Sequence, residues 1–480
     1  MLGGLIVLIG TARCSGSGPS RLTSASTLRV GVGGVPLLAP QAGLRQVVAT
    51  LSLEGLVGPN DDGRPRPWLA ESWTTAPDGL SVTLNLRHQA KFHDGTPVTA
   101  PLVVQALQKS LPGVMGPAFD DVEQIVPVDA GRVRVDLRRP SRFLLEALET
   151  SIQKPGKDGV STGPYVASTT TTTAELHANA DYYQGRPAID LVTITPYPSV
   201  RTAWAELLRG NLDMLYEVNI DALDSLQAAT NVAVFSFVRH YQFAITFSAH
   251  APNLESAAVR RELNAAIDRS AVVRDGLNGH GIPSTGPVPP RHWALDSTAP
   301  KLAFNRTLAA NLATRHLRFT CLVPADSVYE RVALAVKQQL AAAAVDMRVE
   351  EVTQEQILQA TRSDNFEAVL VDPISGPTVF RAYRQFYSTV PFTPKPRGSS
   401  LIDAALDRIR HAASDDEYRA GVTAFQQAIV DDPPAIFLAW GERARAVSRR
   451  FDVPTPENGR DILPNLRLWR PAAQQVASRN

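Results

Sequence analysis

Valine and leucine alternate with polar residues in two segments of the first third of the chain. They occupy every second position of residues 81–87, and the same spacing returns in residues 132–138. A period of two places all the apolar side chains of a strand on one face of a sheet. The pattern therefore predicts two half-buried antiparallel strands. A further strand is predicted at residues 28–32, after the N-terminal segment, and a loop rich in glycine and proline follows it.

Other segments repeat their apolar residues at the spacing of an α-helix. Helices are predicted at residues 99–107, 202–209, 253–269, 326–344 and 414–430. A strand at residues 347–352 should follow the fourth of these helices. The threonine run 169–173 indicates a β-rich edge, because threonine favours strands. Together these segments predict a mixed α/β protein.

Composition limits the architecture and the partners. With 480 residues and 44% hydrophobic content the chain can fill two or three large cores. Its 48 basic residues nearly cancel its 47 acidic ones, so no overall field favours nucleic acid. Beyond the first residues, no stretch reaches the roughly 20 apolar residues that a membrane-spanning helix needs. Any partner must therefore be recognised locally.

One of the two cysteines lies close to the N-terminus, in a segment that resembles a processing signal. Cys14 and Cys321 are the only two, which is a poor disulfide framework. Cys14 follows the apolar run 5–9 and precedes a flexible Ser/Gly segment. This arrangement resembles a bacterial lipoprotein signal in which the cysteine is lipidated. Arg13 stands where such signals carry a small residue, and so an ordinary secretory segment with an incidental cysteine remains the alternative.

Four groups of segments carry a family likeness. The first group is EGLV at 54–57, LAESW at 69–73, DGL at 78–80 and KFHDGTPVTA at 91–100. The second is GPY at 163–165, NADYY at 179–183, GRP at 185–187 and LLRGNLD at 207–213. The third is VRRELNAAIDR at 259–269 with GPVPP at 286–290, and the fourth is PAIFL at 434–438 with the basic stretch 443–450. Together they resemble the peptide/nickel-type extracytoplasmic solute-binding proteins (family 5, cluster C) of ABC importers.

The resemblance implies an α/β, two-lobed, periplasmic-binding-protein-like (type II) fold. An extra α+β subdomain would lie in the first lobe, and a hinge would join the lobes. The expected division is a signal and tether at 1–27, lobe I at 28–246 with the subdomain at about 51–162, lobe II at 247–432, and a return to lobe I at 433–480.

The resemblance also implies a function. The protein would capture a small solute, an oligopeptide or peptide-like molecule, by closure of its lobes. It would deliver the solute to the permease subunits of an ABC importer. We expect a monomer outside the cytoplasm, anchored to the outer face of the cytoplasmic membrane through Cys14, with no cofactor, metal or nucleic-acid partner.

The expected pocket departs from the family at one loop. Peptide binders of this family usually carry a tryptophan and then an amine-binding aspartate after a buried strand. Here the matching strand is 366–371, and Pro373 and Gly376 stand at those two places. Asp372 is the candidate substitute, with an Asp-Pro turn as the alternative reading. The other candidate pocket residues are Val35, Pro36, Phe247 and Trp440, for each of which plain packing is the alternative.

Two rival functions remain. The first is an enzyme, because Ser151 and Lys154 match Ser-x-x-Lys and residues 363–365 match Ser-Asp-Asn of penicillin-recognising enzymes. The third motif of those enzymes is missing, and Pro155 follows at once where a helix is required. The second rival is a solute-binding fold that has a regulatory or protein-partner role in the cell envelope and no transport ligand.

Overall fold

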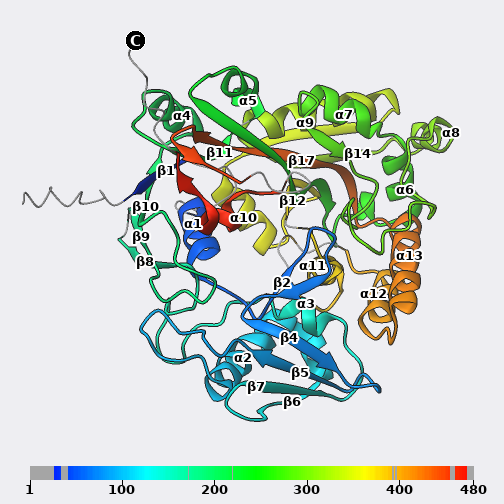
Figure 1. Cartoon of the computed structure of the whole chain (residues 1–480). Helices are drawn as coiled ribbons and strands as arrows, with labels where there is room; N and C mark the ends of the chain where they lie inside the picture. Colours follow the sequence, from blue (N-terminus) through cyan, green and yellow to red (C-terminus); the bar gives the residue numbers. More distant parts are fainter. Residues whose placement is uncertain are drawn as a thin grey trace, which may run out of the picture.

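Eleven strands form one sheet through the upper part of the described molecule (Figure 1). The computed structural model describes residues 26–33, 42–170, 172–218, 220–373, 375–391, 394, 397–454 and 460–472. The strands of the sheet, from one edge to the other, are β15 (Asp346–Val352), β14 (Arg318–Pro324), β16 (Ala368–Val371), β12 (Val232–Phe247), β17 (Ala435–Ser448), β11 (Met214–Val218), β1 (Thr27–Gly33), β10 (Leu191–Tyr197), β9 (Ala174–Ala178) and β8 (Tyr165–Thr169), with β13 (Gly281–Pro283) paired to β17.

The sheet confirms three of the predicted strands. β1 is parallel to β10 and β11, and its apolar residues Leu28 and Val30 are fully buried. β15 follows a helix and is parallel to β14. The threonine run lies at the turn of the β8–β9 hairpin, and β8 ends the sheet, so the predicted β-rich edge is also confirmed.

The two longest strands described, β12 and β17, join the two halves of this sheet. They are antiparallel neighbours from the pair Val232–Ser448 to the pair Thr246–Ala435. β17 continues to β11 and the first-lobe strands, whereas β12 continues to β16 and the second-lobe strands. The ladder is interrupted between Val238 and Gln242, and such irregularities bend and twist a strand pair. These two strands connect the two halves of the sheet and are called the hinge strands below.

Helices cover the sheet in both lobes. On the first-lobe side they are α1 (Ala42–Ser52), α4 (Val200–Leu208), α5 (Ile220–Gln227) and the short η5 (Leu463–Leu468). After β12 the chain forms η2 (Pro252–Leu254), α6 (Ala257–Ala265), α7 (Arg269–Gly276), α8 (Arg306–Ala309), η3 (Ala310–Thr314), α9 (Ser327–Ala342), α10 (Gln354–Arg362), α11 (Val379–Phe386), α12 (Ser400–Arg410) and α13 (Asp415–Asp431). Two short strands, β18 (Phe451–Asp452) and β19 (Arg470–Pro471), pair near the C-terminus.

The single helix predicted at residues 253–269 is wrong, because the chain forms α6 and α7 there with a break between them. Asp268 causes part of this break, since its side chain accepts the N–H groups of Ser270 and Ala271 and caps a new helix. The buried guanidinium of Arg269 donates to the carbonyl oxygens of Asn264 and Ile267 at the same place. The other four predicted helices are confirmed as α2, α4, α9 and α13.

A separate subdomain is inserted between α1 and β8 and lies at the bottom of Figure 1. It contains β2 (Val57–Pro59), β3 (Pro65–Pro67), β4 (Ala70–Thr75), β5 (Ser81–Leu86), α2 (Ala100–Met115), η1 (Gly116–Asp121), β6 (Val122–Pro127), β7 (Arg132–Leu137) and α3 (Phe143–Ala147). The two alternating segments are β5 and β7, which pair antiparallel as predicted. Their sheet has the order β4-β5-β7-β6, and buried residues of α2 pack with it.

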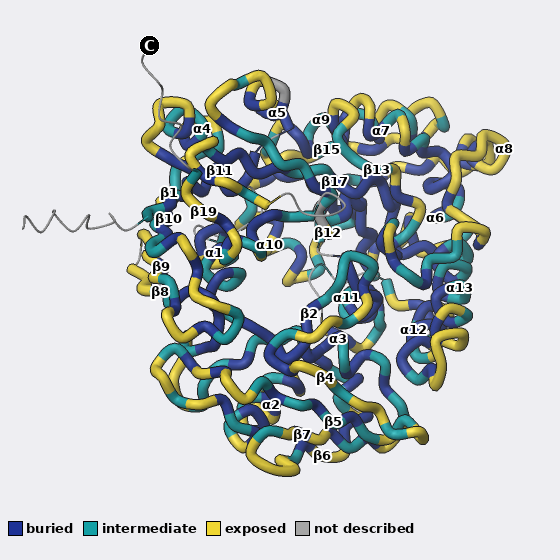
Figure 2. The backbone as a smooth tube through the Cα atoms, viewed as in Figure 1, coloured by how far each residue is buried: buried dark blue, intermediate teal, exposed yellow. Residues whose placement is uncertain are grey.

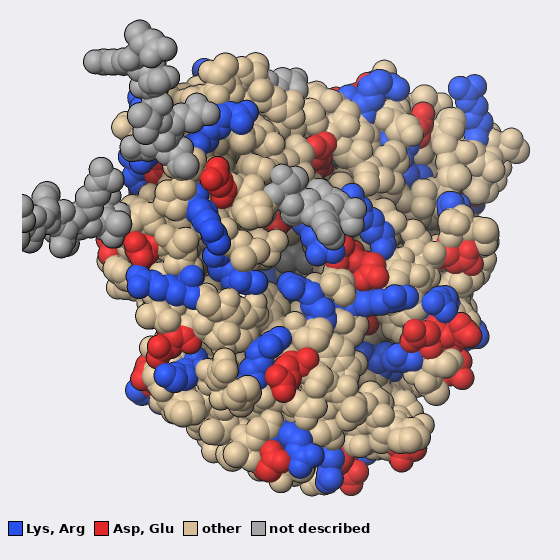
Figure 3. All heavy atoms as spheres, in the orientation of Figure 1, with Lys and Arg blue, Asp and Glu red and all other residues tan. Residues whose placement is uncertain are grey.

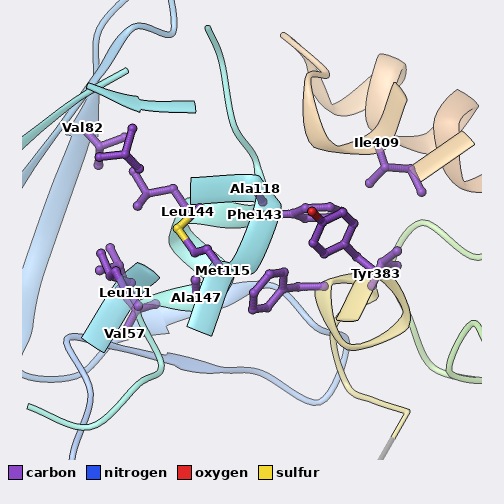
Figure 4. Packing of buried hydrophobic residues seen from close by; sticks show 14 of the residues in the cluster. Val57, Val82, Leu111, Met115, Ala118, Phe143, Leu144, Ala147, Tyr383 and Ile409 are labelled. Carbon is purple, nitrogen blue, oxygen red and sulfur yellow. The ribbon is translucent and has the colours of Figure 1, made fainter. Parts of the chain in front are cut away.

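One hydrophobic cluster joins the subdomain to α11, α12 and α13 of the second lobe (Figure 4). The backbone of these parts includes many buried positions (Figure 2). Phe143 of α3 packs against both Phe380 and Tyr383 of α11, with ring centroids 5.5 and 5.0 Å away. Buried charges accompany these rings, because Asp121 of η1 pairs with Arg410 of α12. The contact between these parts is therefore built like a protein core.

Candidate functional site

A cavity of about 290 Å³ lies where the first lobe, the subdomain hairpin, the hinge strands and loops of the second lobe meet. Its lining residues are Gln46, Thr50, Asp61, Tyr216, Phe237, Val238, His240, Tyr241, Ile282, Pro289, Pro290, Arg291, Gly376, Trp440, Arg445, Arg460 and Asp461. Its volume is at the lower end of the range for small-molecule sites. A molecule held there would touch both lobes at once.

Arg445 is the buried cation of this cavity. It points from β17 to Asp461, with distances of 3.0 Å from Nε to Oδ1 and 2.6 Å from Nη2 to Oδ2. Its guanidinium also lies over the rings of Tyr216, at 4.0 Å, and Phe237, at 5.1 Å. Burial opposes the charge of Arg445, but the attraction of Asp461, Tyr216 and Glu217 together outweighs it and raises the pKa of the arginine above its ordinary value.

A second ion pair closes another side of the cavity. Arg460 pairs with Asp61, which lies at the tip of the β2–β3 hairpin. The nearby Arg66 is an exposed residue of β3, and partial desolvation of its guanidinium and repulsion from Arg460 lower its pKa. Cations are therefore crowded where the subdomain hairpin meets the C-terminal segment. Figure 3 likewise shows Lys and Arg side chains, with fewer Asp and Glu side chains, around the middle of the drawn face.

Neutral polar groups complete the lining. The amide of Gln46 on α1 donates to the hydroxyl of Tyr241 and accepts from that of Tyr216, both at 2.9 Å. These bonds connect α1 to β12 and β11. Desolvation of its ring lowers the pKa of His240, another residue of the lining. The backbone of this histidine contacts the loop after β16, where the His240 carbonyl oxygen accepts the N–H of Ser375 at 2.8 Å.

The loop after β16 brings Gly376 to the cavity wall. A Cβ atom at this position would lie 2.8 Å from Pro289 and 3.4 Å from Nδ1 of His240. The position where the resemblance leads us to expect an aspartate therefore faces the cavity and has little room for a side chain.

The sequence-predicted pocket residues do not all lie at the cavity. Trp440 lines the cavity. Phe247 is fully buried in the second-lobe core, opposite Ala368 of β16, and is absent from the lining of the cavity described above. Val35, Pro36 and Cys14 lie outside the described residues.

Asp372 belongs to a charged network beside the hinge. Its carboxylate lies 3.8 Å from Nη2 of Arg443, whose Nε donates to Glu217 at 2.9 Å. Burial first, and then Asp372, raise the pKa of the Tyr329 hydroxyl far above its ordinary value. A network that includes β11, β17, α9 and the loop after β16 thus contacts both lobes.

The arginines of the cavity were not among the residues expected from the sequence. For Arg445 the signal is the alternation in β17, where it and Arg443, which lies outside the cavity lining, occupy every second position of a mostly buried strand. Buried arginines need partners, so this spacing indicates an internal ion-pair network. Their acidic partners, Glu217 and Asp461, are distant in sequence and gave no signal of their own.

A second cavity, of about 310 Å³, shares Trp440 and Pro290 with the first. It lies between residues 283–301 and α13, which contributes Gln426 and Ile429. Trp440 therefore forms part of the wall between two hollow regions.

The residues of the enzyme rival do not form a catalytic arrangement. Ser151 lies in an isolated β-bridge with Gly55, and Lys154 binds Asp94, with 2.6 Å from Nζ to Oδ2. His93 is a turn residue whose Nε2 lies 3.1 Å from the Gly163 carbonyl oxygen. Within the described residues no group of three His, Cys, Asp or Glu side chains is placed to hold a metal. None of the described helices has the length and apolarity needed to cross a membrane.

Comparison with known proteins gives a consistent family match. The model of the family "Bacterial extracellular solute-binding proteins, family 5 Middle" matches residues 64–390. The chain is 28% identical to the glutathione-binding protein GsiB of Shigella flexneri, over 52% of each protein. It is 27% identical to the GsiB protein of Escherichia coli K12, with the same coverage. The chain thus spans about half the length of the curated relatives it matches.

Solved structures share the whole fold. CtaP from Listeria monocytogenes has a TM-score of 0.81 at 19% identity, over 93% of this chain and 99% of that one. NikZ from Campylobacter jejuni, in complex with Ni(L-His), has a TM-score of 0.80 at 19% identity, over 92% and 99%. The oligopeptide-binding protein AppA from Bacillus subtilis, in complex with a nonapeptide, has a TM-score of 0.76 at 19% identity, over 94% and 100%. These matches confirm the expected two-lobed α/β fold.

Proposed function

Because the chain belongs to the family 5 bacterial extracellular solute-binding proteins, we propose that it is the solute-binding component of an ABC importer. The observation that carries the proposal is the cavity itself, whose walls come from both lobes and from the hinge strands between them. A ligand that contacts both lobes favours the closed form, since only that form offers all the contacts. The importer can then recognise occupancy by shape.

The solute is proposed to be a small peptide or peptide-like molecule. The relatives and structural neighbours include proteins described as binding glutathione, a nickel–histidine complex and a nonapeptide. The cavity of about 290 Å³ suits a molecule of a few residues better than a long oligopeptide. Trp440 would pack against the solute. Asp372 would act at a distance from it, by holding Arg443 at the hinge.

Location and anchoring belong to the same proposal. The family is a family of extracellular binding proteins. A protein of this kind would work outside the cytoplasm as a monomer, together with permease subunits and without catalytic turnover. Cys14 would carry the lipid that holds it to the membrane. Labelling with a radioactive fatty acid in a bacterial host, compared between the wild type and Cys14→Ser, tests the anchor, and equal labelling of both proteins would exclude it.

Two measurements test the binding function. Native mass spectrometry of the purified protein should show a bound small molecule that is lost on denaturation. Small-angle X-ray scattering should show a smaller radius of gyration when the emptied protein is given that molecule. A protein that stays empty, and that does not compact with any of a panel of peptides, sugars and metal chelates, would favour the regulatory role over transport.

A further inference from the structure

Trp440 lies between two cavities, and this position gives it a part in selecting the solute. We propose that Trp440 determines how large an apolar group the solute can carry, because its side chain separates the binding cavity from the second cavity. This inference rests on the proposed function, since it concerns which molecules the same binding cavity accepts.

The two cavities are similar in size and share a wall. The binding cavity has a volume of about 290 Å³ and the second cavity one of about 310 Å³. Trp440 and Pro290 line both of them. Trp440 is only 2% exposed, so the protein encloses its large side chain on nearly all sides. Joining the two cavities would therefore roughly double the space that a solute can enter.

Strand pairing and buried hydrogen bonds hold this wall in place. Trp440 of β17 pairs with Gln242 of β12 on one side and with Ile282 of β13 on the other. The buried amide of Gln242 donates to the hydroxyl of Ser284 and, at 2.6 Å, to the carbonyl oxygen of Gly286. The N–H of Ser284 also donates to a carbonyl oxygen of β17 at 3.0 Å. The loop after β13 is thus attached to both hinge strands, and moving the wall would break buried hydrogen bonds at a cost.

The second cavity suits an apolar group. Four prolines line it, together with Val288, Leu295 and Ile429. Polar groups of its wall bind each other, because the side chain of Gln426 accepts the N–H of Asp296 at 3.0 Å and donates to its carbonyl oxygen at 2.9 Å. An apolar group placed there would leave these bonds intact, and its removal from water would be favourable.

The wall therefore sets a limit that a substitution can remove. With Trp440 in place, a solute group that points toward it has only the space of the binding cavity, and a large ring there would collide with the indole. A small residue at position 440 would open the way into the second cavity. The same large ring would then gain a buried, apolar place.

The test varies the size of one apolar side chain of a peptide. Isothermal titration calorimetry of the emptied full-length protein would use Ala-Ala-Ala and the three peptides in which one alanine is replaced by phenylalanine. At one position, phenylalanine should weaken binding to the wild type by roughly tenfold or more. In Trp440→Ala the order at this position should reverse, so that the phenylalanine peptide binds roughly tenfold tighter than Ala-Ala-Ala.

A second substitution should restore the limit. A Cβ atom at Gly286 would meet Ile429 at 3.8 Å, which is an ordinary contact, and both residues line the second cavity. Leucine at position 286 would therefore fill part of that cavity. Adding Gly286→Leu to Trp440→Ala should abolish the tighter binding of the phenylalanine peptide. Gly286→Leu alone should leave the affinities of all four peptides unchanged.

Controls separate this effect from a general loss of structure. Trp204→Ala removes a partly buried tryptophan of α4 that lines neither cavity, and it should keep the wild-type order of the peptides. Thermal unfolding checks that every variant folds. Trp440→Leu removes less volume and takes the place of Trp440→Ala if the alanine variant does not fold.

The outcomes distinguish this inference from the proposed function. Reversal in the Trp440 variant, abolished by Gly286→Leu, supports both. The same order of peptides in the wild type and the Trp440 variant, or weaker binding caused by Gly286→Leu alone, overturns the size limit and leaves the binding function intact. A protein that binds none of the peptides and purifies without a ligand overturns both.

Discussion

Replacing Glu146 by glutamine should make the stability of this protein less sensitive to pH. Glu146 lies on α3, where its carboxylate accepts the N–H of Phe380 at 2.8 Å and the hydroxyl of Tyr418 at 3.0 Å. Burial raises the pKa of this carboxyl from 4.5 to about 7. The folded protein therefore holds a proton that the unfolded chain releases, and stability must fall as the pH rises through this range.

The magnitude follows from the pKa. A difference of one in pKa corresponds to about 1.4 kcal/mol, so above pH 7 the charged Glu146 lowers the free energy of unfolding by about 3 kcal/mol. Below pH 4.5 the effect is absent, because the carboxyl is protonated in both states. Glutamine keeps the contacts, since its carbonyl can accept from Phe380 and its NH₂ can donate to the oxygen of Tyr418. Relative to the wild type, Glu146→Gln should gain about 3 kcal/mol between pH 4.5 and 8.

Urea unfolding of both proteins at about pH 5, 6.5 and 8 measures this gain. The quantity to compare is the slope, against pH, of the difference in unfolding free energy between the two proteins. A difference that is constant with pH reports only a change in packing. Glu123→Gln, on the exposed face of β6 in the same subdomain, is the control and should give a flat line. A difference between Glu146→Gln and the wild type that is constant over this range, or that grows toward acid, would refute the reasoning.

Three further predictions concern stability. Gly163→Ala should lower the free energy of unfolding in urea by about 2 kcal/mol or more, because the added Cβ would lie 2.5 Å from the backbone of residue 52. Gly113→Ala, in open space on α2, should raise it by up to about 1 kcal/mol. Equal effects of the two substitutions would contradict this. Burial lowers the pKa of His292 to about 4, so the free energy of unfolding should fall by about 3 kcal/mol as the pH drops from 6.5 to 4. In His292→Phe, urea unfolding should show a smaller fall over the same pH range. Phe143→Ala should lose about 3–5 kcal/mol, measured by thermal unfolding, because its ring is fully buried among those of α11; a loss under about 1 kcal/mol would place it outside the core.

The strands and helices that were predicted correctly have signals that are local in the sequence. The alternation of β5 and β7 and the Ser414 N-cap before α13 each lie within a few residues. The break between α6 and α7 was missed because apolar spacing continues across it. What ends α6 is partly Arg269, whose guanidinium also donates to the carbonyl of Phe437, far away in sequence. Spacing alone carries no trace of that partner.

The candidate site was less predictable, because its electrostatics depend on pairs made by the fold. Asp372 attracted attention as an isolated carboxylate, yet its neighbour Arg443 is brought to it only by the pairing of β12, β16 and β17. Arg445 was overlooked because its partner Asp461 lies in a different segment, after β17 and β18. Trp440 was a candidate pocket residue from the sequence, and the cavity does include it.

The apolar contact between the subdomain and α11–α13 should make the closing of the lobes depend on temperature. Parting the lobes along this contact would hydrate the rings of Phe143, Phe380 and Tyr383. Apolar hydration increases heat capacity, so closing should carry a negative heat-capacity change beyond the part due to the solute. The same attraction weakens on cooling. Lobes that stay together without solute in a warm solution should therefore separate more often near freezing, and solute should bind less tightly there.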